Sequence, residues 1–215
     1  MASRQGHSAS PEPVDLDARR TADDHLMIRL QNGSRAAFDE LVTKYQAELC
    51  GFFYKNLRDW PLAEDLTQET LLKIYNQSWD YLPLGRFRGW MFRIARNLMI
   101  DNSRRRSRDA LVHSIRVVNN HRREEQDAVA QLASEWKLPE ERAAQADLAA
   151  HVDRFLEELP AEQRMTFTLH HFHGVPLAEV ADAMETNEST AKSRLRLARE
   201  KLRQRLETIG ITGKS

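Results

Sequence analysis

Apolar side chains recur at three- and four-residue steps along most of the chain, and this spacing constrains the fold more than any other feature. The clearest run begins at Phe38 and ends at Leu57. Such a repeat places the apolar side chains on one face of an α-helix. Residues 1–106 show no strand-like alternation, and helical spacing returns towards the C-terminus. We therefore expect an all-α protein.

Capping signals divide this pattern into separate helices. Thr21 with Asp24 resembles a capping box, Ser34 is a second N-cap, and Asp59 followed by Pro61 begins a third helix. A Leu-Pro-Leu-Gly segment at 82–85 ends that third helix. The predicted helices cover about 22–31, 34–58, 61–77, 88–106, 147–158 and 161–172, followed by a pair of helices between 177 and 206.

The chain is organised as two helical segments between irregular ones. Residues 1–20 are rich in Ser, Pro and charge, and residues from Ser107 to Gln145 have no clear period. A segment of that length allows the two halves to lie apart. We expect a disordered tail (1–20), a first small helical domain (21–107), a flexible linker (108–145), a second small helical domain (146–208) and a short tail (209–215).

Composition excludes several classes of protein. The single cysteine, Cys50, excludes an intramolecular disulfide framework and a Cys-based zinc site. No apolar run approaches the roughly 20 residues that span a bilayer, and the N-terminus lacks the apolar region of a signal peptide. We expect a cytoplasmic protein without membrane insertion.

Charge is segregated along the chain although the formal net charge is zero. Basic residues strongly outnumber acidic ones in 71–107 and again in 188–206. Segregation of this kind is typical of a protein that binds a polyanion such as nucleic acid.

The segment after Arg88 carries two helical faces. Met91, Ile94, Ala95 and Leu98 form an apolar face. Beside it, a strip combines an aromatic ring, an amide and two guanidinium groups: Trp90, Arg93, Asn97 and Arg104. Such a strip suits single-stranded nucleic acid, because bases stack on aromatic rings and arginines hold phosphates. The alternative is a half-buried core tryptophan beside solvated arginines.

Two short helices near the C-terminus form a helix-turn-helix pattern. Leu177, Val180 and Met184 line the first, and Ala191, Leu195, Ala198 and Leu202 line the second, basic one. In this motif the second helix enters the DNA major groove by its N-terminal end. An ordinary helical hairpin with a basic face is the alternative.

Signals for catalysis or metal binding are weak. His170, His171 and His173 place at most two rings on one helical face, and polar residues are expected at a helix C-terminus. Glu64, Asp65 and Glu69 lie in the first turns of a helix, where acids are favourable. No phosphate-binding loop or catalytic triad pattern is present. We expect no enzyme activity, metal or cofactor.

Three segments together resemble a known family. AEDLTQETLLKIY, FRGWMFRIARNLMIDNSRRR and LAEVADAMETNESTAKSRLRLAREKLR, in this order, are similar to bacterial sigma factors of the sigma-70 family. The most similar group is the extracytoplasmic-function type, which keeps only regions 2 and 4. The resemblance covers about 21–107 (region 2) and 145–207 (region 4). It implies a non-enzymatic protein that binds core RNA polymerase and promoter DNA; anti-sigma proteins are common further partners in the family.

The resemblance also assigns roles to individual residues. Polymerase binding falls on Asp65, Gln68 and Glu69. Recognition and melting of the −10 element as a single strand fall on Phe87, Arg88, Trp90, Arg93, Asn97 and Arg104, with the loop Trp79–Arg86 matching a pocket for a flipped base. Recognition of the −35 duplex falls on Thr190, Lys192, Ser193, Arg194, Arg196 and Arg199.

The helix-turn-helix departs from the family pattern at its turn. Glu185 stands where a small residue, commonly Gly, is usual, and Thr186 stands where an aliphatic is usual. A left-handed conformation at Glu185 would cost about 1–2 kcal/mol. Three other functions stay open at this point: a stand-alone helix-turn-helix regulator of transcription, an RNA-binding regulator and a helical adaptor for proteins.

Overall fold

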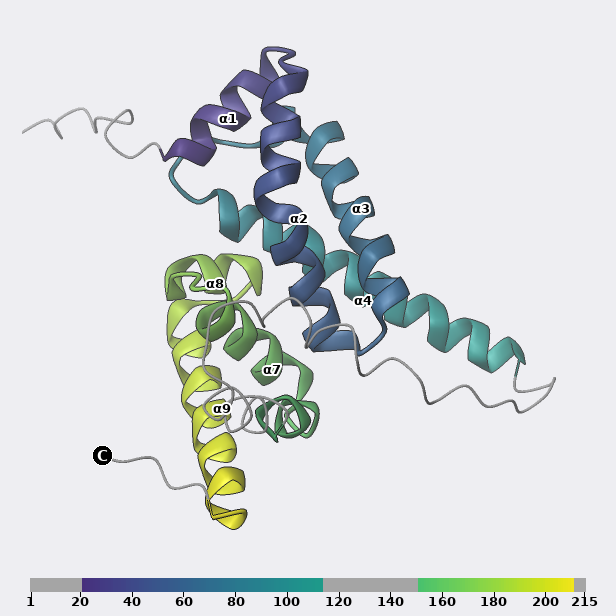
Figure 1. Cartoon of the computed structure of the whole chain (residues 1–215), viewed down its shortest axis with the longest axis vertical. Helices are drawn as coiled ribbons and strands as arrows, with labels where there is room; N and C mark the ends of the chain where they lie inside the picture. The colour runs from purple at the N-terminus through teal and green to yellow at the C-terminus, as the bar shows by residue number, and fades with distance from the viewer. Residues whose placement is uncertain (1–20, 114–150, 211–215) are drawn as a thin grey trace, which may run out of the picture.

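The computed structural model describes residues 21–113 and 151–210, and within these ranges every regular element is helical (Figure 1). This confirms the predicted all-α fold. The N-terminal half (21–113) contains α1 (Ala22–Gln31), α2 (Arg35–Leu57), α3 (Trp60–Asn76), the 3-10 turn η2 (Ser78–Asp80) and α4 (Phe87–His113). The C-terminal half (151–210) contains a helix over 151–157, then α7 (Ala161–Phe167), the π-turn η3 (Thr168–Phe172), α8 (Leu177–Ala183) and α9 (Glu188–Thr208).

Side-chain caps start the first three helices at the predicted residues. Thr21 and Asp24 form a reciprocal capping box, in which the Thr21 N–H donates to the Asp24 carboxylate at 2.6 Å. The Ser34 and Asp59 side chains each accept a hydrogen bond from the backbone N–H three residues on, at 3.3 and 3.0 Å. An N-cap of this kind stabilises a helix by about 1 kcal/mol.

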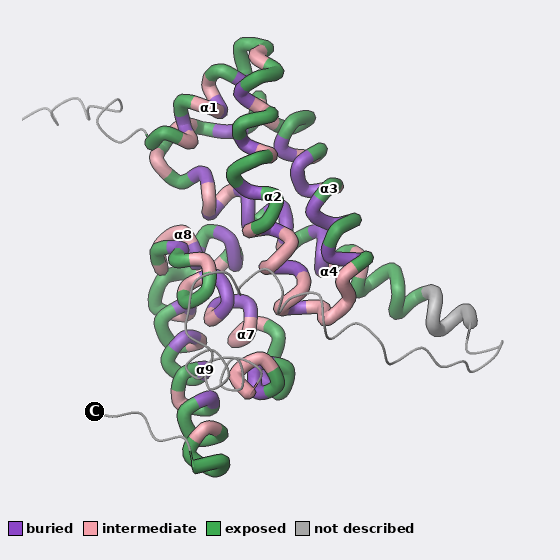
Figure 2. Tube along the Cα trace, viewed as in Figure 1, coloured by how far each residue is buried: buried purple, intermediate pink, exposed green. Residues whose placement is uncertain are grey.

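Buried aromatic rings hold the N-terminal half together. Phe52, Phe53, Phe87 and Phe92 have almost no exposed surface. The Phe52 and Phe92 ring centroids lie 5.2 Å apart with the planes at 62°, an edge-to-face arrangement that aromatic pairs prefer. Figure 2 shows the buried residues of α2, α3 and α4 facing one another between the helices.

Two helices differ from the sequence prediction. α4 continues to His113 instead of ending near Arg106, because the sequence from Ser107 to His113 contains no Pro or Gly that would end it. The helix predicted over 161–172 is α-helical only to Phe167 and widens into η3. There, the N–H of His173 donates to the Thr168 carbonyl and that of Val175 to the Leu169 carbonyl.

Several predictions concern residues outside the described ranges. They are the disordered tail 1–20, the linker from 114 onwards, the start of the helix predicted at 147, and the end of the C-terminal tail. The first six residues of the predicted linker, 108–113, continue α4.

The two halves pack against each other, although the sequence allows them to lie apart. α8 lies against α4 in Figure 1. Six apolar residues of the C-terminal half belong to the same buried cluster as the N-terminal core: Met165, Leu169, Val175, Val180, Ala183 and Met184. A second, smaller cluster lies within the C-terminal half and is formed by Phe155, Leu156, Leu159, Ala198 and Leu202.

Candidate nucleic-acid interface

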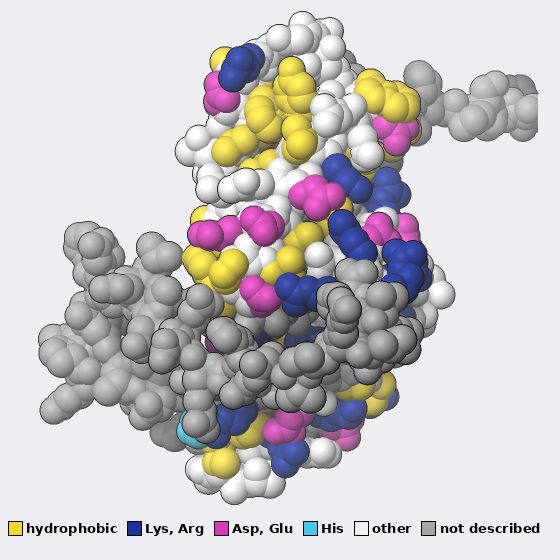
Figure 3. All heavy atoms as spheres, turned by 90° about the vertical axis from the view of Figure 1, so that its right-hand side faces the viewer, with side chains coloured by type: hydrophobic (Ala, Val, Ile, Leu, Met, Phe, Trp, Pro, Cys, Tyr) yellow, Lys and Arg dark blue, Asp and Glu magenta, His cyan; other side chains and the backbone are white. Residues whose placement is uncertain are grey.

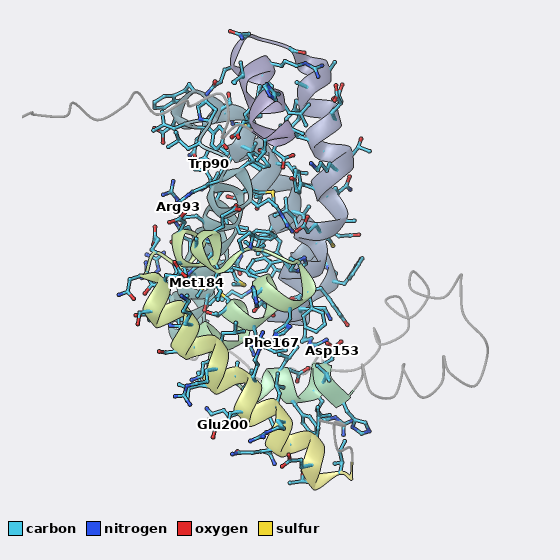
Figure 4. The ribbon with its side chains drawn as sticks, turned by 90° about the vertical axis from the view of Figure 1, so that its left-hand side faces the viewer. Trp90, Arg93, Asp153, Phe167, Met184 and Glu200 are labelled. Carbon is cyan, nitrogen blue, oxygen red and sulfur yellow. The ribbon has the colours of Figure 1, made fainter. Side chains whose placement is uncertain are left out.

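The predicted strip on α4 lies on the surface. Arg93, Asn97 and Arg104 are exposed, and Trp90 is half-buried. The Trp90 ring packs on Tyr81, with 5.1 Å between centroids, and on Phe87, at 6.1 Å. Figure 4 shows Trp90 and Arg93 along the same edge of the molecule. The ring is thus both a partial core residue and the aromatic member of the exposed strip.

Phe87 and Arg88, predicted as DNA contacts, lie elsewhere. Phe87 is 2% exposed, so in this arrangement it supports the Trp90 ring from the core instead of offering a face to a base. The Arg88 guanidinium is directed into the protein, where it donates to the Glu48 carboxylate and the His173 carbonyl. The prediction that these two residues contact DNA came from the resemblance to the sigma-70 family and not from helical spacing, which leaves them out of the exposed strip.

Buried hydrogen bonds hold the loop Trp79–Arg86 in place. The Asp24 carboxylate is fully buried and accepts from the Tyr81 hydroxyl and from the Gly85 N–H at 2.9 Å. The Gln31 amide donates to the Ser78 and Tyr81 carbonyls at 2.8 and 2.9 Å. Burial and the Asp24 carboxylate raise the pKa of the Tyr81 hydroxyl, which therefore stays a donor.

Asp24 and Gln31 are positioning residues that sequence reasoning missed. The only sequence signal at Asp24 was its place in a capping box. Their effect is to leave the apolar side chains of the loop outside: Trp79 is 76% and Leu82 is 70% exposed.

The acidic face of α3 is accessible. Asp65 and Gln68 are exposed and Glu69 is half-buried, and no ion pair within the described ranges engages the two carboxylates. On the same face, Leu72 is 57% exposed and Tyr75 47%. Figure 3 shows hydrophobic and acidic side chains together on the upper part of the α3 side.

Exposed apolar residues bordered by polar ones are typical of a protein–protein interface, which has an apolar centre and a polar rim. Sequence reasoning missed Leu72 and Tyr75. The sequence signal that could have indicated their exposure was their position on the polar face of an amphipathic helix.

α9 presents its basic face to solvent. Its apolar face, formed by Ala191, Leu195, Ala198 and Leu202, is buried. Asn187 caps the helix, since its side chain accepts from the Thr190 N–H at 2.8 Å. Three of the predicted DNA contacts lie exposed in the first turns, namely Lys192, Ser193 and Arg196; Thr190 beside them is half-buried.

Arg194 and Arg199 have partners within the protein. The Arg194 guanidinium lies 3.0 Å from the Glu162 carboxylate of α7, with 26% of its side chain exposed. The exposed Arg199 donates to the His171 ring at 2.8 Å. Burial and the Arg199 charge lower the pKa of His171, which keeps this nitrogen free to accept.

The turn of the helix-turn-helix has the strained geometry considered above. Glu185 adopts a left-handed conformation, with φ of 49°. Its carboxylate lies 3.2 Å from the Arg96 guanidinium of α4 in the other half of the molecule. The turn residue therefore also belongs to the contact between the two halves.

The three histidines have separate environments. The His170 ring contacts the Val175 carbonyl at 3.0 Å, as expected of a polar residue at a helix end. His173 differs from that expectation, because its side chain is only 8% exposed and packs on the Phe52 and Phe92 rings. Burial, with Arg88 nearby, lowers its pKa to about 4. Glu48 lies 3.7 Å away, but its carboxylate is already paired with Arg88, so burial dominates.

The described part of the chain holds no group of three His, Cys, Asp or Glu side chains placed to bind a metal ion. In the same ranges, no helix combines the length and the apolar character needed to cross a membrane.

Comparisons with known proteins place both halves of the chain in one family. Residues 41–109 match the family described as Sigma-70 region 2, and residues 150–202 match Sigma-70, region 4. RNA polymerase sigma-H factor of Pseudomonas aeruginosa is 29% identical over 193 residues, which are 87% of this chain and 95% of that protein.

Two further relatives agree with these matches. The ECF RNA polymerase sigma factor SigW of Bacillus subtilis is 25% identical over 84% of this chain and 95% of its own length. The solved structure of the sigma factor RpoE in complex with the anti-sigma factor NepR, from Bartonella quintana, has a similar fold, with a TM-score of 0.60 and 21% identity over 79% of this chain and 96% of that one. With both regions matched in order along one all-helical chain, the protein belongs to the extracytoplasmic-function group of the sigma-70 family.

Proposed function

We propose that this protein is a non-catalytic initiation factor of the cytoplasm that binds bacterial core RNA polymerase, directs it to specific promoters and assists DNA melting there. The observation that carries this function is the exposed strip of Trp90, Arg93, Asn97 and Arg104 on α4. A ring that is anchored on Tyr81 and Phe87 but keeps an exposed face can stack on an unpaired base, while the arginines beside it hold phosphates.

The other surfaces fit separate parts of the same task. Asp65, Gln68 and Glu69, with Leu72 and Tyr75, supply an acidic and apolar face for a basic site on the polymerase. The loop Trp79–Arg86 is held rigidly from α1 and offers exposed apolar side chains to an extruded base. The N-terminal end of α9 reads the −35 duplex through Lys192, Ser193 and Arg196, with Thr190 beside them.

Transcription in vitro tests the function directly. Core polymerase would be combined with promoter fragments from the source genome, with and without the protein. We expect discrete promoter-specific transcripts only in its presence. Tight binding of the free protein to an operator duplex, with no transcript from any promoter, would instead support a stand-alone helix-turn-helix regulator, which has no use for the α3 face.

Replacement of Trp90 tests the melting role. Trp90→Ala removes the stacking ring, worth about 1–3 kcal/mol for one base. It should impair transcription from a duplex promoter strongly and from a pre-melted bubble much less. Trp60→Ala is the matched control, because Trp60 lies at the start of α3 and bonds to Glu64 at 3.0 Å. Equal losses on both templates would exclude a melting role for Trp90.

An anti-sigma protein is the regulatory partner that we infer for this factor. A protein of similar fold has been solved bound to the anti-sigma factor NepR. Co-purification of the chain with the product of a neighbouring gene, and loss of transcription when that product is added, would test this partner.

A further inference from the structure

Two consecutive carboxylates at the start of α1 each hold a tyrosine hydroxyl. The Asp23 carboxylate accepts from the Tyr45 hydroxyl of α2 at 2.7 Å. The Asp24 carboxylate accepts from the hydroxyl of Tyr81, in the loop Trp79–Arg86. Successive residues of a helix point about 100° apart, and α1 lies beside α2 in Figure 1. One carboxylate therefore reaches α2 and the next reaches the loop, so the first turn of α1 fixes a ring from each.

These two tyrosine rings belong to a buried aromatic platform beneath Trp90, formed by Tyr45, Tyr81 and Phe87. The Phe87 centroid lies 5.3 Å from that of Tyr45 and 5.7 Å from that of Tyr81. The Trp90 ring packs on Tyr81 at 5.1 Å and on Phe87 at 6.1 Å. The three platform rings are at most 3% exposed, whereas Trp90 is half-buried. The platform therefore sets the direction in which the Trp90 ring faces the solvent.

The hydrogen bonds that hold the platform are buried. Asp24 has no exposed surface, and its carboxylate also accepts from the Thr21 and Gly85 N–H groups at 2.6 and 2.9 Å. The Asp23 side chain is 13% exposed and lies 2.5 Å from the Lys44 ammonium group. Burial, together with the adjacent carboxylate, raises the pKa of each tyrosine hydroxyl, which therefore stays a donor. Because a buried carboxylate without its donor is costly, each hydroxyl is confined to one position.

α1 lies outside the family match reported above. The match to Sigma-70 region 2 begins at residue 41, whereas α1 ends at Gln31. The two aspartates of α1 nevertheless bond to rings of the platform that carries Trp90. The family match therefore assigns no role to these two carboxylates.

We propose, on the basis of the function proposed above, that Asp23 and Asp24 are positioning residues for promoter melting, because they fix the platform that directs Trp90 towards an unpaired base. Stacking places a base parallel to the ring. A ring that is already held in the required orientation loses less conformational freedom on binding and therefore binds more tightly. A role limited to stability would instead weaken every activity of the N-terminal half together.

Removal of the hydroxyls tests the platform with the rings in place. The measurement is the affinity of the factor, bound to core polymerase, for a fluorescent single-stranded oligonucleotide with the −10 sequence of a promoter that it transcribes. Tyr81→Phe should lower this affinity about fivefold, and Tyr45→Phe, which acts through Phe87, about twofold. The affinity for core polymerase itself should stay unchanged in both variants. Equal losses in the two affinities would show a purely structural role and would overturn the proposal.

Replacement of the aspartates tests the acceptors. Asp24→Asn places an amide group beside the Gly85 N–H and should lower the oligonucleotide affinity about tenfold, and Asp23→Asn should lower it about threefold. Glu40→Gln is the matched control, since the Glu40 carboxylate pairs with Arg29 of α1 at 2.9 Å on the exposed surface. This variant makes the same change at another contact between α1 and α2 and should keep the affinity. A similar loss in Glu40→Gln would mean that any loosening of α1 is sufficient, which would contradict a specific role for the aspartates.

A positioning residue acts through the residue that it positions. In a Trp90→Ala background, Tyr81→Phe should therefore change the oligonucleotide affinity by less than about twofold. An undiminished loss in this background would mean that Tyr81 acts by another route, and the proposal would fail.

Fluorine NMR of the free, full-length protein reports on the Trp90 ring directly. In protein labelled with 5-fluorotryptophan, the Trp90 resonance is identified by its loss in Trp90→Phe. Tyr81→Phe and Asp24→Asn should shift or broaden this resonance and leave that of Trp60, at the start of α3, unchanged. A comparable change at Trp60 would mean that the variants loosen the whole half, and it would exclude a positioning role.

Transcription by the unmodified protein separates failure of this inference from failure of the proposed function. If promoters are transcribed but Tyr81→Phe changes neither the oligonucleotide affinity nor the Trp90 resonance, only the positioning role is rejected. If the Trp90 resonance responds but no promoter is transcribed, the proposed function is rejected and the role in melting with it, and the platform remains a property of the fold.

Discussion

The two halves of the molecule bury their apolar side chains differently. In the N-terminal half, long helices surround large aromatic rings, including Phe52, Phe53, Phe87 and Phe92, and supply most of the main buried cluster. In the C-terminal half, α7 and α8 have seven residues each. These short helices place Val180 and Met184 against the N-terminal core and leave a small separate cluster around Leu156 and Leu202.

This difference gives the halves unequal independence. The N-terminal half can be stable by itself, because long helices with a packed aromatic interior satisfy their own apolar faces. The C-terminal half shares an apolar face with its neighbour, so it needs either that neighbour or another partner to cover the face. Separation of the C-terminal half from the N-terminal half would therefore expose apolar side chains such as Val180 and Met184, unless a partner covered them.

Removal of an aromatic ring from the shared core should have the largest effect. Phe52→Ala leaves a cavity beside Phe53, Phe92 and His173, and should lower the free energy of unfolding by about 3–5 kcal/mol. Leu202→Ala, in the small cluster, should cost about 2–3 kcal/mol and loosen only the C-terminal half. Urea denaturation with hydrogen exchange would measure both. If Phe52→Ala left exchange in α8 unchanged, the shared core would be disproved.

Acid should weaken the contact between the two halves through His173. The pKa of this ring is lowered from 6.5 to about 4 in the folded protein, so between these values the unfolded chain binds a proton that the folded chain does not. The free energy of unfolding therefore falls as the pH falls through this window, and the stabilisation is complete above 6.5. The pKa of His173 differs by about 2.5 between the unfolded and the folded chain. Since a pKa difference of 1 corresponds to about 1.36 kcal/mol, His173 contributes up to about 3 kcal/mol to the free energy of unfolding.

Urea denaturation at a series of pH values measures this dependence. His173→Gln should flatten the profile between pH 4 and 6.5, whereas replacement of the exposed His25 by Gln should leave it unchanged. An unaltered slope in the His173 variant would show that other groups cause the acid sensitivity.

Charge reversal on α3 should separate the binding roles of the halves. Asp65→Lys should weaken the affinity for core polymerase about tenfold, or about 1.4 kcal/mol, and leave binding to a −35 duplex unchanged. Arg196→Ala should weaken binding to the −35 duplex and leave the affinity for core polymerase unchanged. Fluorescence anisotropy with each ligand measures both, and Asp39→Lys on the exposed face of α2 controls for net charge. Equal losses for both ligands in one variant would contradict the division.

Loss of a helix cap should have the smallest effect and the most local one. Asn187→Ala removes the acceptor for the Thr190 N–H and should cost about 1 kcal/mol. The loss should appear as faster exchange at the start of α9 and weaker binding to the duplex. Thr21→Ala should cost a similar amount in α1 without affecting binding to the −35 duplex. An effect of either variant in the other half would mean that the halves are coupled more tightly than their packing implies.

Much of the N-terminal half could be predicted from the sequence, because its signals are local. Thr21, Ser34 and Asp59 cap helices through bonds to residues three positions on, so spacing alone locates them. The exposed strip on α4 also follows from helical geometry. Phe87 and Arg88 could not be placed in this way, since their burial depends on Tyr45 and Glu48 of another helix. The exposure of Leu72 and Tyr75 could not be predicted either, because the sequence does not show whether another helix covers an apolar side chain.

The sequence alone determined the helices, their caps, the segregation of charge and the order of the two DNA-binding segments. All of these depend on neighbours within one or two turns. Only the tertiary structure decided that Arg58 and Glu185 adopt a left-handed conformation and contact the opposite half. It also decided that α8 packs closely against the backbone of α4 at Gly89. Those contacts join residues roughly 90 positions apart, and no periodicity reports a distance of that kind. The closed contact between the halves is therefore a property of packing, which the local pattern permits but does not specify.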